Sequence, residues 1–525
     1  MAQRGGELAA KSAKPSGEDR LSALPDDVLV LILLRLGTRE AIRTSGLSRR
    51  WRRLWALLPE LRFDDLVPDG VGIRRILEAP EEAAPLRWIS VTTQGAGPES
   101  AAAWLPVAAR RVSGELVYHN MPPATAMNEH GDVDKDDDKP VGGGDLHLPC
   151  FEKATTIALN INFLGLALPP QGIFARLTEL SLRRLRFRSP SELGSVVSSP
   201  RCPCLKKLEV SNSRGLQNLS IHSESLLQLK LLDLHRLLHL TIVAPILQEL
   251  GVGSCIRARG PSEPVAIANI SAPQLVALDW KDFYDPQYVH LGDLGQLQRL
   301  TTAYDAYGRH TTLSQHRLRL LQRFQAAALY SLHLWLIYLQ DIDDLQYLVG
   351  DIKMLPQITS LHLVVVNGGH AHHAFGASSF HLLRMCTGLR SLYLFVARSN
   401  LELEVKLCLF TQVQSTCPSG CICDQPMNWK IEELVLNHLD FVMIVGLHGA
   451  DHEVAFLKQL FNWATVLRRM IIVFDYRISE SKAREFRRAV VGCSRPETSV
   501  EFHICHDASK RTTCLLAPEG HGTML

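Results

Sequence analysis

A leucine-rich unit of the form LxxLxL recurs along most of the chain and constrains its fold more than any other feature. The fourth and sixth positions of each copy alternate as in a short strand, which points both side chains into a core. One unit cannot bury its own apolar face, whereas stacked units share a continuous core and a parallel sheet. The twelve copies start at Leu177, Leu205, Leu216, Leu226, Leu237, Leu247, Leu275, Leu329, Ile358, Leu389, Ile431 and Leu467.

The spacing of these copies is irregular. Five of the copies between 177 and 275 are separated by 21 or 28 residues, which suits leucine-rich repeats. The copies at 216 and 237 leave too few residues for a strand and a helix, so we expect tight extended turns on the convex side. The inward Asn or Cys that usually follows is clear only at Cys255, which argues against a regular asparagine ladder. The sequence therefore predicts an α/β fold with an irregular leucine-rich-repeat solenoid.

The N-terminal segment 20–57 holds three short amphipathic helical patterns, which are too small to build a self-sufficient core. Pro25 suits a first helical position, where its missing N–H costs nothing. Residues 28–34 are apolar throughout, which indicates a helix packed between two surfaces. Trp51 and Trp55 are four residues apart and share one helical face. The segment must therefore dock on the rest of the chain or on another protein.

The order, spacing and capping of these residues resemble an F-box, which is an adaptor-binding module. The plain alternative is a helical subdomain with buried tryptophans. The residues that carry the resemblance are expected to contact a Skp-type adaptor, although some of them must face the repeats instead and the sequence does not sort them. They are Leu24, Pro25, Leu29, Ile32, Leu36, Leu47, Trp51 and Trp55.

The C-terminal stretch 428–474 resembles the FBD region that follows the repeats in a plant F-box subfamily. Its pattern predicts a strand at 434–436, a turn at Gly446 and Gly449, a helix and a closing strand. A second helix and an alternating strand from 500 to 504 complete a β-α-β unit, which we expect to cap the open end of the solenoid. From Arg20 to about Cys505, most of the chain thus resembles plant F-box/leucine-rich-repeat proteins of the FBD-containing subfamily.

These patterns divide the chain into consecutive parts. An acidic, glycine-rich insertion within the second folded part has no apolar periodicity and is expected to be disordered. The predicted parts are a disordered tail (1–19), the F-box (20–60), a linker or first repeat-like unit (61–145) with the insertion (122–144), the repeats (146–430), the FBD-like cap (431–508) and a second tail (509–525).

Charge and cysteine content narrow the classes of function. The formal net charge is only +2, so no overall field draws the chain to nucleic acid or to an anionic membrane. The basic run at 49–53 is expected to form a solvated helix face opposite the tryptophans. The N-terminus has no apolar segment typical of a signal peptide, so we expect a nuclear or cytoplasmic protein whose 12 cysteines are reduced thiols.

Candidate chemistry is weak. Cys417, Cys421 and Cys423 are the only metal candidates, but their spacing matches no standard structural zinc pairing, so free thiols are favoured. The histidines between 370 and 373 form a polar turn in which a chance cluster is favoured over a site. Phosphate-binding loops and nucleophile motifs are absent from the sequence. We therefore expect no catalysis, no cofactor and no bound metal.

The resemblance implies a function in protein recruitment. It predicts the substrate-recognition subunit of an SCF-type cullin-RING ubiquitin ligase, which binds a Skp-type adaptor, through it the cullin and RING subunits, and a target through the repeats. The alternative is a leucine-rich-repeat scaffold that binds proteins without joining a ligase. A small-molecule pocket in the concave face is an analogy at the level of the fold only. The identity of the target does not follow from the sequence.

Overall fold

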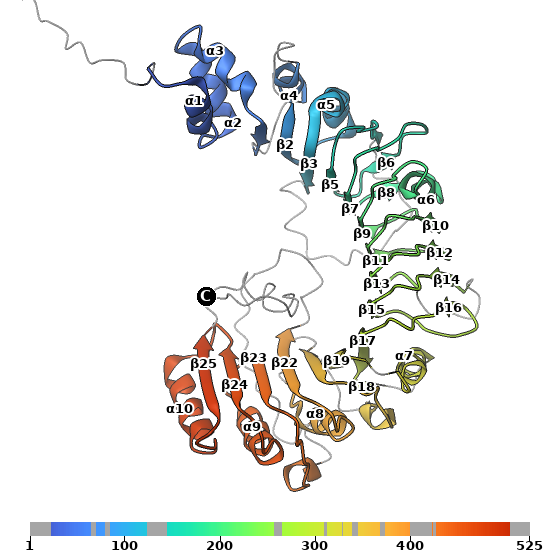
Figure 1. Ribbon diagram of the computed structural model, residues 1–525, viewed down its shortest axis with the longest axis vertical. Coiled ribbons are helices and arrows are strands. Elements are labelled where there is room, and N and C mark those ends of the chain that lie inside the picture. The colour runs from blue at the N-terminus through green and yellow to red at the C-terminus, as the bar shows by residue number, and fades with distance from the viewer. Residues whose placement is uncertain are drawn as a thin grey trace, which may run out of the picture.

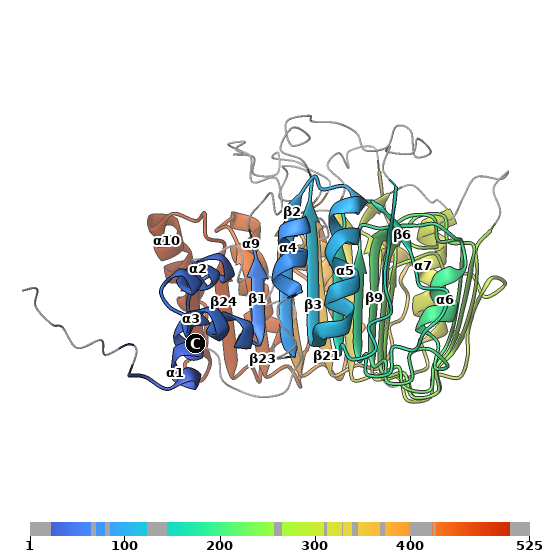
Figure 2. The same cartoon turned by 90° about the horizontal axis from the view of Figure 1, so that it is seen from above.

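The computed structural model describes residues 21, 23–64, 70–78, 85–122, 144–256, 265–308, 312–327, 329–338, 345–367, 373–398, 423 and 427–504. These residues form an open horseshoe with one continuous sheet along its inner face (Figure 1). The labelled helices of the repeats lie on the outer face, and the N-terminal three-helix unit stands at one end of the arc (Figures 1 and 2). The predicted α/β solenoid with a parallel sheet is confirmed.

The inner sheet is sixteen-stranded among the described residues, and all of its neighbouring strands are parallel. Its strands follow chain order from one end of the horseshoe to the other. They are β1 (Glu60–Phe63), β2 (Leu86–Gln94), β3 (Val112–Met121), β5 (Thr156–Asn160), β7 (Glu179–Arg183), β9 (Lys207–Ser213), β11 (Gln228–Leu234), β13 (Glu249–Gly253), β15 (Ala277–Trp280), β17 (Arg299–Asp305), β19 (Ser331–Tyr338), β21 (Ser360–Asn367), β22 (Ser391–Arg398), β23 (Phe441–Leu447), β24 (Arg469–Phe474) and β25 (Ser499–Ile504).

Side chains alternate across this sheet as the repeat pattern predicts. In β9, Leu208 and Val210 are fully buried toward the outer layer, while Lys207 and Glu209 lie on the inner face. The residue that opens the copy, Leu205, is also fully buried. The same pattern holds in consecutive strands, so their apolar side chains form one core along the horseshoe.

The closely spaced copies at 216 and 237 are strands and not the turns expected from their spacing. They form β10 (Asn218–His222) and β12 (His239–Val243), which pair in a second parallel sheet with β14 (Ile267–Ser271) and β16 (Val289–Leu291). Leu219 and Leu240 face each other in this sheet and are 1 % exposed. The outer segments of adjacent repeats stack closely enough for their backbone N–H and C=O groups to hydrogen-bond to each other. These groups are therefore paired although the segments are not helical.

Smaller elements complete the outer layer. A three-stranded sheet holds β4 (Asp145–His147), β6 (Gly165–Ala167) and β8 (Arg186–Phe187), and β18 (Tyr307–Gly308) pairs antiparallel with β20 (Gln346–Tyr347). The helices of this layer are α4 (Gly70–Leu77), α5 (Pro98–Arg111), α6 (Glu192–Val197), α7 (Thr312–Arg323), η4 (Val349–Asp351), α8 (Gly376–Leu383), η6 (Met427–Lys430), α9 (Asp451–Trp463) and α10 (Glu480–Val491).

Buried polar contacts between repeats replace an asparagine ladder. Cys255 is buried, and its Sγ donates to the carbonyl oxygens of Leu231 and Gly253 at 3.3 and 3.2 Å. The backbone N–H groups of Cys255 and Ile256 both donate to Asp282 Oδ2 at 2.8 Å. Burial raises the pKa of the Cys255 thiol well above its ordinary value. Neighbouring coils are therefore joined by a carboxylate and a thiol instead of amides.

The C-terminal strand lies further along the chain than expected. Residues 434–436 are not a strand, and the strand is β23, whose Val442 and Ile444 are fully buried. The repeat template fits from Leu439, which is also fully buried, whereas Ile431 is 84 % exposed. Gly446 lies within β23 at a bulge rather than in a turn, with a φ of 89°.

The elements after β23 alternate as helix, strand, helix and strand, in the order β23, α9, β24, α10 and β25. Strand pairing runs from β3 to β5 and from β22 to β23, so the sheet continues across both predicted boundaries of the repeat region. A separate FBD-like cap over 431–508 and the other part boundaries therefore stay predictions.

Candidate adaptor-docking site

The N-terminal unit is built from three short helices. They are α1 (Asp26–Leu33), α2 (Thr38–Arg43) and α3 (Trp51–Leu54), with 3-10 turns η1 (Thr44–Gly46) and η2 (Trp55–Leu57). Pro25 is the N-cap of α1 with extended backbone angles, one residue earlier than the sequence indicates. Asp26 and Asp27 occupy the first turn of α1, where carboxylates interact favourably with the helix dipole.

Two of the residues predicted to contact the adaptor are buried inside the chain. Leu29 is fully buried and Trp51 is 7 % exposed, and both belong to the core together with Leu33 and Leu54. A unit this small needs these side chains to hold its own helices together. Leu29 and Trp51 therefore stabilise the unit and are not on its surface. Leu24 and Trp55 are half-buried and pack against the same core.

Other apolar side chains of the unit remain exposed. Among the predicted residues, Pro25 is exposed, and Ile32, Leu36 and Leu47 are 37, 43 and 69 % exposed. Two leucines outside the predicted set are also exposed: Leu31 is 63 % exposed, and Leu57 in η2 is 37 % exposed. The helical period turns Leu31 and Ile32 away from Leu29 and Leu33. The wholly apolar run at 28–34 could have indicated these exposed side chains, because only one side of α1 fills the core and the other side must then expose apolar residues to solvent.

Arg50 fixes the geometry of the exposed side. Its Nε donates to Asp26 Oδ1 at 2.7 Å, and its Nη2 donates to the carbonyl oxygen of Leu24. The turn before α1 is thereby fastened to the start of α3. The expectation that the basic run 49–53 is only a solvated face is therefore wrong for Arg50, which is half-buried.

The three-helix unit passes directly into the inner sheet. β1 starts after η2 and pairs with β2, with Leu61 opposite Ile89. The backbone N–H of Arg62 donates to Thr38 Oγ1 at 2.5 Å, and the Arg62 guanidinium lies 5.6 Å from the ring centroid of Trp88. The segment after residue 60 is thus the first strand of the solenoid. This sequence of contacts sets the orientation of the unit relative to the horseshoe.

The weak metal candidates fall mostly outside the described residues. Cys417, Cys421, His370 and His372 lie there, whereas Cys423 is buried and its Sγ accepts from the backbone N–H of Ala374 at 3.2 Å. In the described part of the chain, His, Cys, Asp and Glu side chains form no group of three or more that could hold a metal ion.

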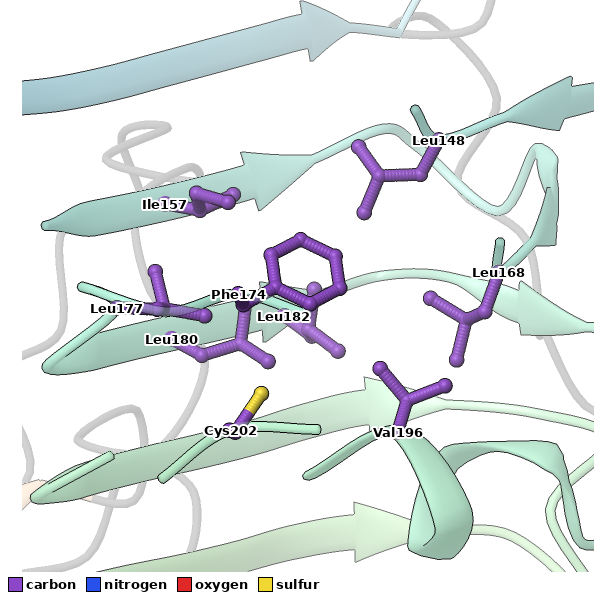
Figure 3. A pocket seen from close by; sticks show the side chains of 9 residues that line it. All are labelled: Leu148, Ile157, Leu168, Phe174, Leu177, Leu180, Leu182, Val196 and Cys202. Carbon is purple, nitrogen blue, oxygen red and sulfur yellow. The ribbon is translucent and has the colours of Figure 1, made fainter. Parts of the chain in front are cut away.

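Two cavities in the described part of the fold lack an arrangement of catalytic groups. A void of about 10 Å³ between the inner sheet and the outer layer is lined only by apolar side chains and Cys202 (Figure 3). A wider hollow of about 350 Å³ lies between α9 and α10, with Lys458, Lys482, Asp451 and Glu485 among its lining residues. Neither brings a nucleophile next to a general base. None of the helices in the described ranges is both long and apolar enough to cross a membrane.

Comparison with known proteins identifies the class. A family model of the F-box domain matches residues 21–63, and a model of the LRR repeats of the FBD-associated F-box protein At5g56370 matches residues 144–292. The chain thus combines an F-box domain with leucine-rich repeats of the kind found in FBD-associated F-box proteins. Its resemblance to the plant F-box/leucine-rich-repeat proteins of the FBD-containing subfamily is confirmed.

Individual relatives come from Arabidopsis thaliana. The F-box/FBD/LRR-repeat protein At5g53840 is 55 % identical over 53 residues, which is 10 % of this chain and 12 % of the relative. The F-box/FBD/LRR-repeat protein At2g04230 is 60 % identical over 47 residues, which is 9 % of this chain and 10 % of the relative. The FBD-associated F-box protein At5g56400 is 28 % identical over 202 residues, which is 37 % of this chain and 40 % of the relative. The chain thus spans well under half the length of these relatives.

Proposed function

We propose that this chain is the substrate-recognition subunit of an SCF-type cullin-RING ubiquitin ligase. The F-box binds a Skp-type adaptor, which links it to the cullin and RING subunits, and the repeats bind a target protein. The observation that carries the proposal is the set of exposed apolar side chains on an otherwise well-packed F-box, led by Leu31 and Leu47. Several large apolar side chains exposed on one small three-helix unit are expected of a protein interaction site.

In the proposed ligase, the chain promotes ubiquitin transfer only by bringing the target close to the ubiquitin-charged enzyme. The chain raises the effective concentration of target lysines near the ubiquitin-charged enzyme and performs no bond chemistry itself. The direct passage of the F-box into β1 supports this role, because it holds the adaptor end and the repeats at a set distance from each other. We expect this assembly in the nucleus or the cytoplasm, without direct binding to nucleic acid or membrane.

Co-expression of the full chain with a Skp-type adaptor tests the proposal. The wild type is expected to form a stoichiometric complex, and Leu31→Asp with Leu47→Asp is expected to weaken it at least about tenfold, since each aspartate places a charge in an apolar contact. Val265→Asp is the control, because Val265 is an aliphatic residue outside the F-box that is 44 % exposed. Equal adaptor binding by the double variant and the control contradicts the proposal.

The alternative is a repeat scaffold outside any ligase. It predicts that cullin and RING subunits do not co-purify with the chain from cells. The ligase proposal predicts that they co-purify with the wild type and are lost in the Leu31→Asp, Leu47→Asp variant. A further variant, Leu24→Ala with Pro25→Ala, is expected to weaken the complex by disturbing the turn that Arg50 holds.

A further inference from the structure

The inner face of the horseshoe changes chemistry halfway along its length. From β7 to β15 its side chains are largely charged or polar, as in the ion pair of Arg183 with Glu209 at 2.8 Å. From β19 to β24 the inner positions become aromatic and aliphatic. One straight row of paired residues crosses these strands: Trp335, Val364, Phe395, Val445 and Val473.

These residues form a second apolar cluster that is separate from the main core. Val364, Phe395 and Val445 are buried, at 6–7 % exposed, and the half-buried neighbours that surround them are the part of the cluster that a partner can contact. The sheet lies between this cluster and the core beneath the outer helices. We name it the inner apolar patch, and it consists of Trp335, Val364, Val366, Tyr393, Phe395, Met443, Val445 and Val473.

A row of stacked rings borders the patch. His333 and His362 stack with ring centroids 3.9 Å apart, and His362 stacks on Tyr393 at 4.1 Å. Burial lowers the pKa of His333 to about 2 and that of His362 to about 4, so both imidazoles are uncharged near neutral pH. The stacked imidazoles therefore extend an uncharged, ring-lined surface from the patch toward β17.

The guanidinium of Arg299 lies at the edge of this surface. Arg299 starts β17 opposite Ser331, and its charge contributes to lowering the pKa of both histidines. Within the described residues, the Arg299 side chain has no ion pair and no hydrogen-bond acceptor. A half-buried guanidinium without a carboxylate partner favours an incoming acidic group.

The shape of the horseshoe restricts what can reach the patch. The patch lies on strands that line the inside of the arc, while the helices of the same repeats lie outside (Figures 1 and 2). A flat bilayer surface does not fit inside the arc. A protein segment that projects into the arc satisfies the geometry.

We propose that the inner apolar patch and Arg299 form the target-docking surface, and that its occupant is a projecting protein segment with apolar or aromatic anchors next to an acidic side chain. Interfaces are dominated by aromatic and arginine side chains of this kind. The proposal rests on the proposed function, because it places target binding on the half of the solenoid that lies beyond β17.

Short fluorescent peptides test this surface directly. Each peptide of the panel carries leucine and phenylalanine anchors flanked by Glu, Gln or Lys, and its binding to the full-length chain is followed by fluorescence anisotropy. Glu peptides are expected to bind most tightly. Phe395→Asp is expected to weaken them at least about tenfold, and Arg299→Glu to reverse the preference between Glu and Lys peptides.

Lys230→Glu is the matched control for Arg299→Glu. Lys230 is an exposed cation on the inner face of β11, outside the patch, so its reversal is expected to leave the order of the peptides unchanged. Arg299→Glu removes no apolar atoms from the patch, so it keeps the test decisive if Phe395→Asp fails to fold.

Several outcomes overturn the inference. The first is a folded Phe395→Asp variant that binds the peptides as tightly as the wild type does. The second is an Arg299→Glu variant that ranks the Glu, Gln and Lys peptides in the same order as the wild type. The third is that no peptide binds at concentrations up to millimolar. A dimer that Phe395→Asp dissociates, or binding to anionic vesicles that this variant abolishes, assigns the patch to another occupant. Adaptor binding is measured in parallel, since its loss in the wild type refutes the ligase role without affecting the peptide result.

Discussion

Arg50 and Asp26 join two ends of the F-box that are far apart in sequence. The Arg50 guanidinium donates to the Asp26 carboxylate at 2.7 Å and also reaches the carbonyl oxygen of Leu24. This contact holds the turn before α1 against the start of α3. The turn contains Leu24 and Pro25, which the F-box resemblance assigns to adaptor contact, so we propose that Arg50 is a positioning residue for the proposed docking site.

Replacing Arg50 by alanine is therefore expected to loosen the F-box. The ion pair is partly exposed and contributes little, but the loss of both hydrogen bonds is expected to cost about 1 kcal/mol of unfolding free energy. Hydrogen exchange of residues 24–33 should accelerate, and adaptor affinity should fall. Arg53→Ala is the control, because Arg53 is exposed and holds no such contact in the described chain. Identical exchange in both variants would contradict the positioning role.

Core and surface leucines of α1 are expected to behave in opposite ways. Leu29→Ala removes a fully buried side chain and should cost about 2–5 kcal/mol of unfolding free energy. Leu31→Ala changes a side chain that is 63 % exposed, so it should leave stability nearly unchanged and weaken adaptor binding. Thermal unfolding and adaptor titration on both variants separate the two effects. If Leu31→Ala binds the adaptor as the wild type does, Leu31 lies outside the docking site.

The repeat template was sufficient to predict the solenoid, and it also explains one error. Copies at Leu58–Leu61–Phe63 and Leu86–Ile89–Val91 fit the template and form β1 and β2, at the start of the region predicted to be a linker or a first repeat-like unit. The copy assigned to Ile431 belongs at Leu439, because several leucines fit the pattern locally and burial alone distinguishes them. The template does not specify whether an intervening copy becomes a turn or a strand of a second sheet, because that depends on the stacking of neighbouring coils.

Which apolar residues of the F-box are exposed was only partly predictable for a similar reason. Apolar residues of the F-box serve either its own core or a partner, and both uses look alike in sequence. The two uses can be told apart once the orientation of the helix is known, since Leu29 and Leu33 fill the core while Leu31 and Ile32 face solvent. The inner apolar patch was not predicted at all, because it depends on which side chains line up across five strands.

Asp282 is expected to be critical for the stability of the central repeats. Its carboxylate accepts the backbone N–H groups of Cys255 and Ile256, and Asp282→Ala leaves both donors without that partner. The expected loss is about 2–5 kcal/mol of unfolding free energy, measured by urea denaturation. Asp282→Asn keeps a carbonyl acceptor and should lose less. Equal losses in the two variants would show that the hydrogen bonds are not the cause.

Thiol labelling should divide the cysteines by their surroundings. Burial raises the pKa of Cys202 and Cys386 to about 12, whereas Cys204 and Cys493 are exposed. Because the thiolate is the reactive form, iodoacetamide at mildly alkaline pH should label Cys204 and Cys493 first. Mass spectrometry of the labelled peptides measures the order, and labelling in denaturant provides the control, since all four thiols should then react alike. Early labelling of Cys202 or Cys386 in the folded chain would contradict the packing described here.

The stacked histidines predict how stability depends on pH. The pKa values of His333 and His362 in the folded chain are about 2 and about 4, below the ordinary value of 6.5. As pH falls below 6.5 the unfolded chain binds protons before the folded chain does, so unfolding becomes easier. Stability is therefore full above pH 6.5 and is lost progressively toward pH 4, by at most about 1.4 kcal/mol per pH unit for each histidine.

Substitution separates this contribution from those of other groups. His333→Phe with His362→Phe keeps planar rings that can stack and removes both titrating groups, so its unfolding free energy should fall less steeply between pH 6.5 and pH 4 than that of the wild type. His503→Phe is the control, because His503 is exposed on β25. Urea denaturation at a series of pH values gives the slopes. Parallel slopes for the double variant and the wild type would mean that the imidazoles take up protons in the folded chain, and the surface next to Arg299 would then become positive in mild acid.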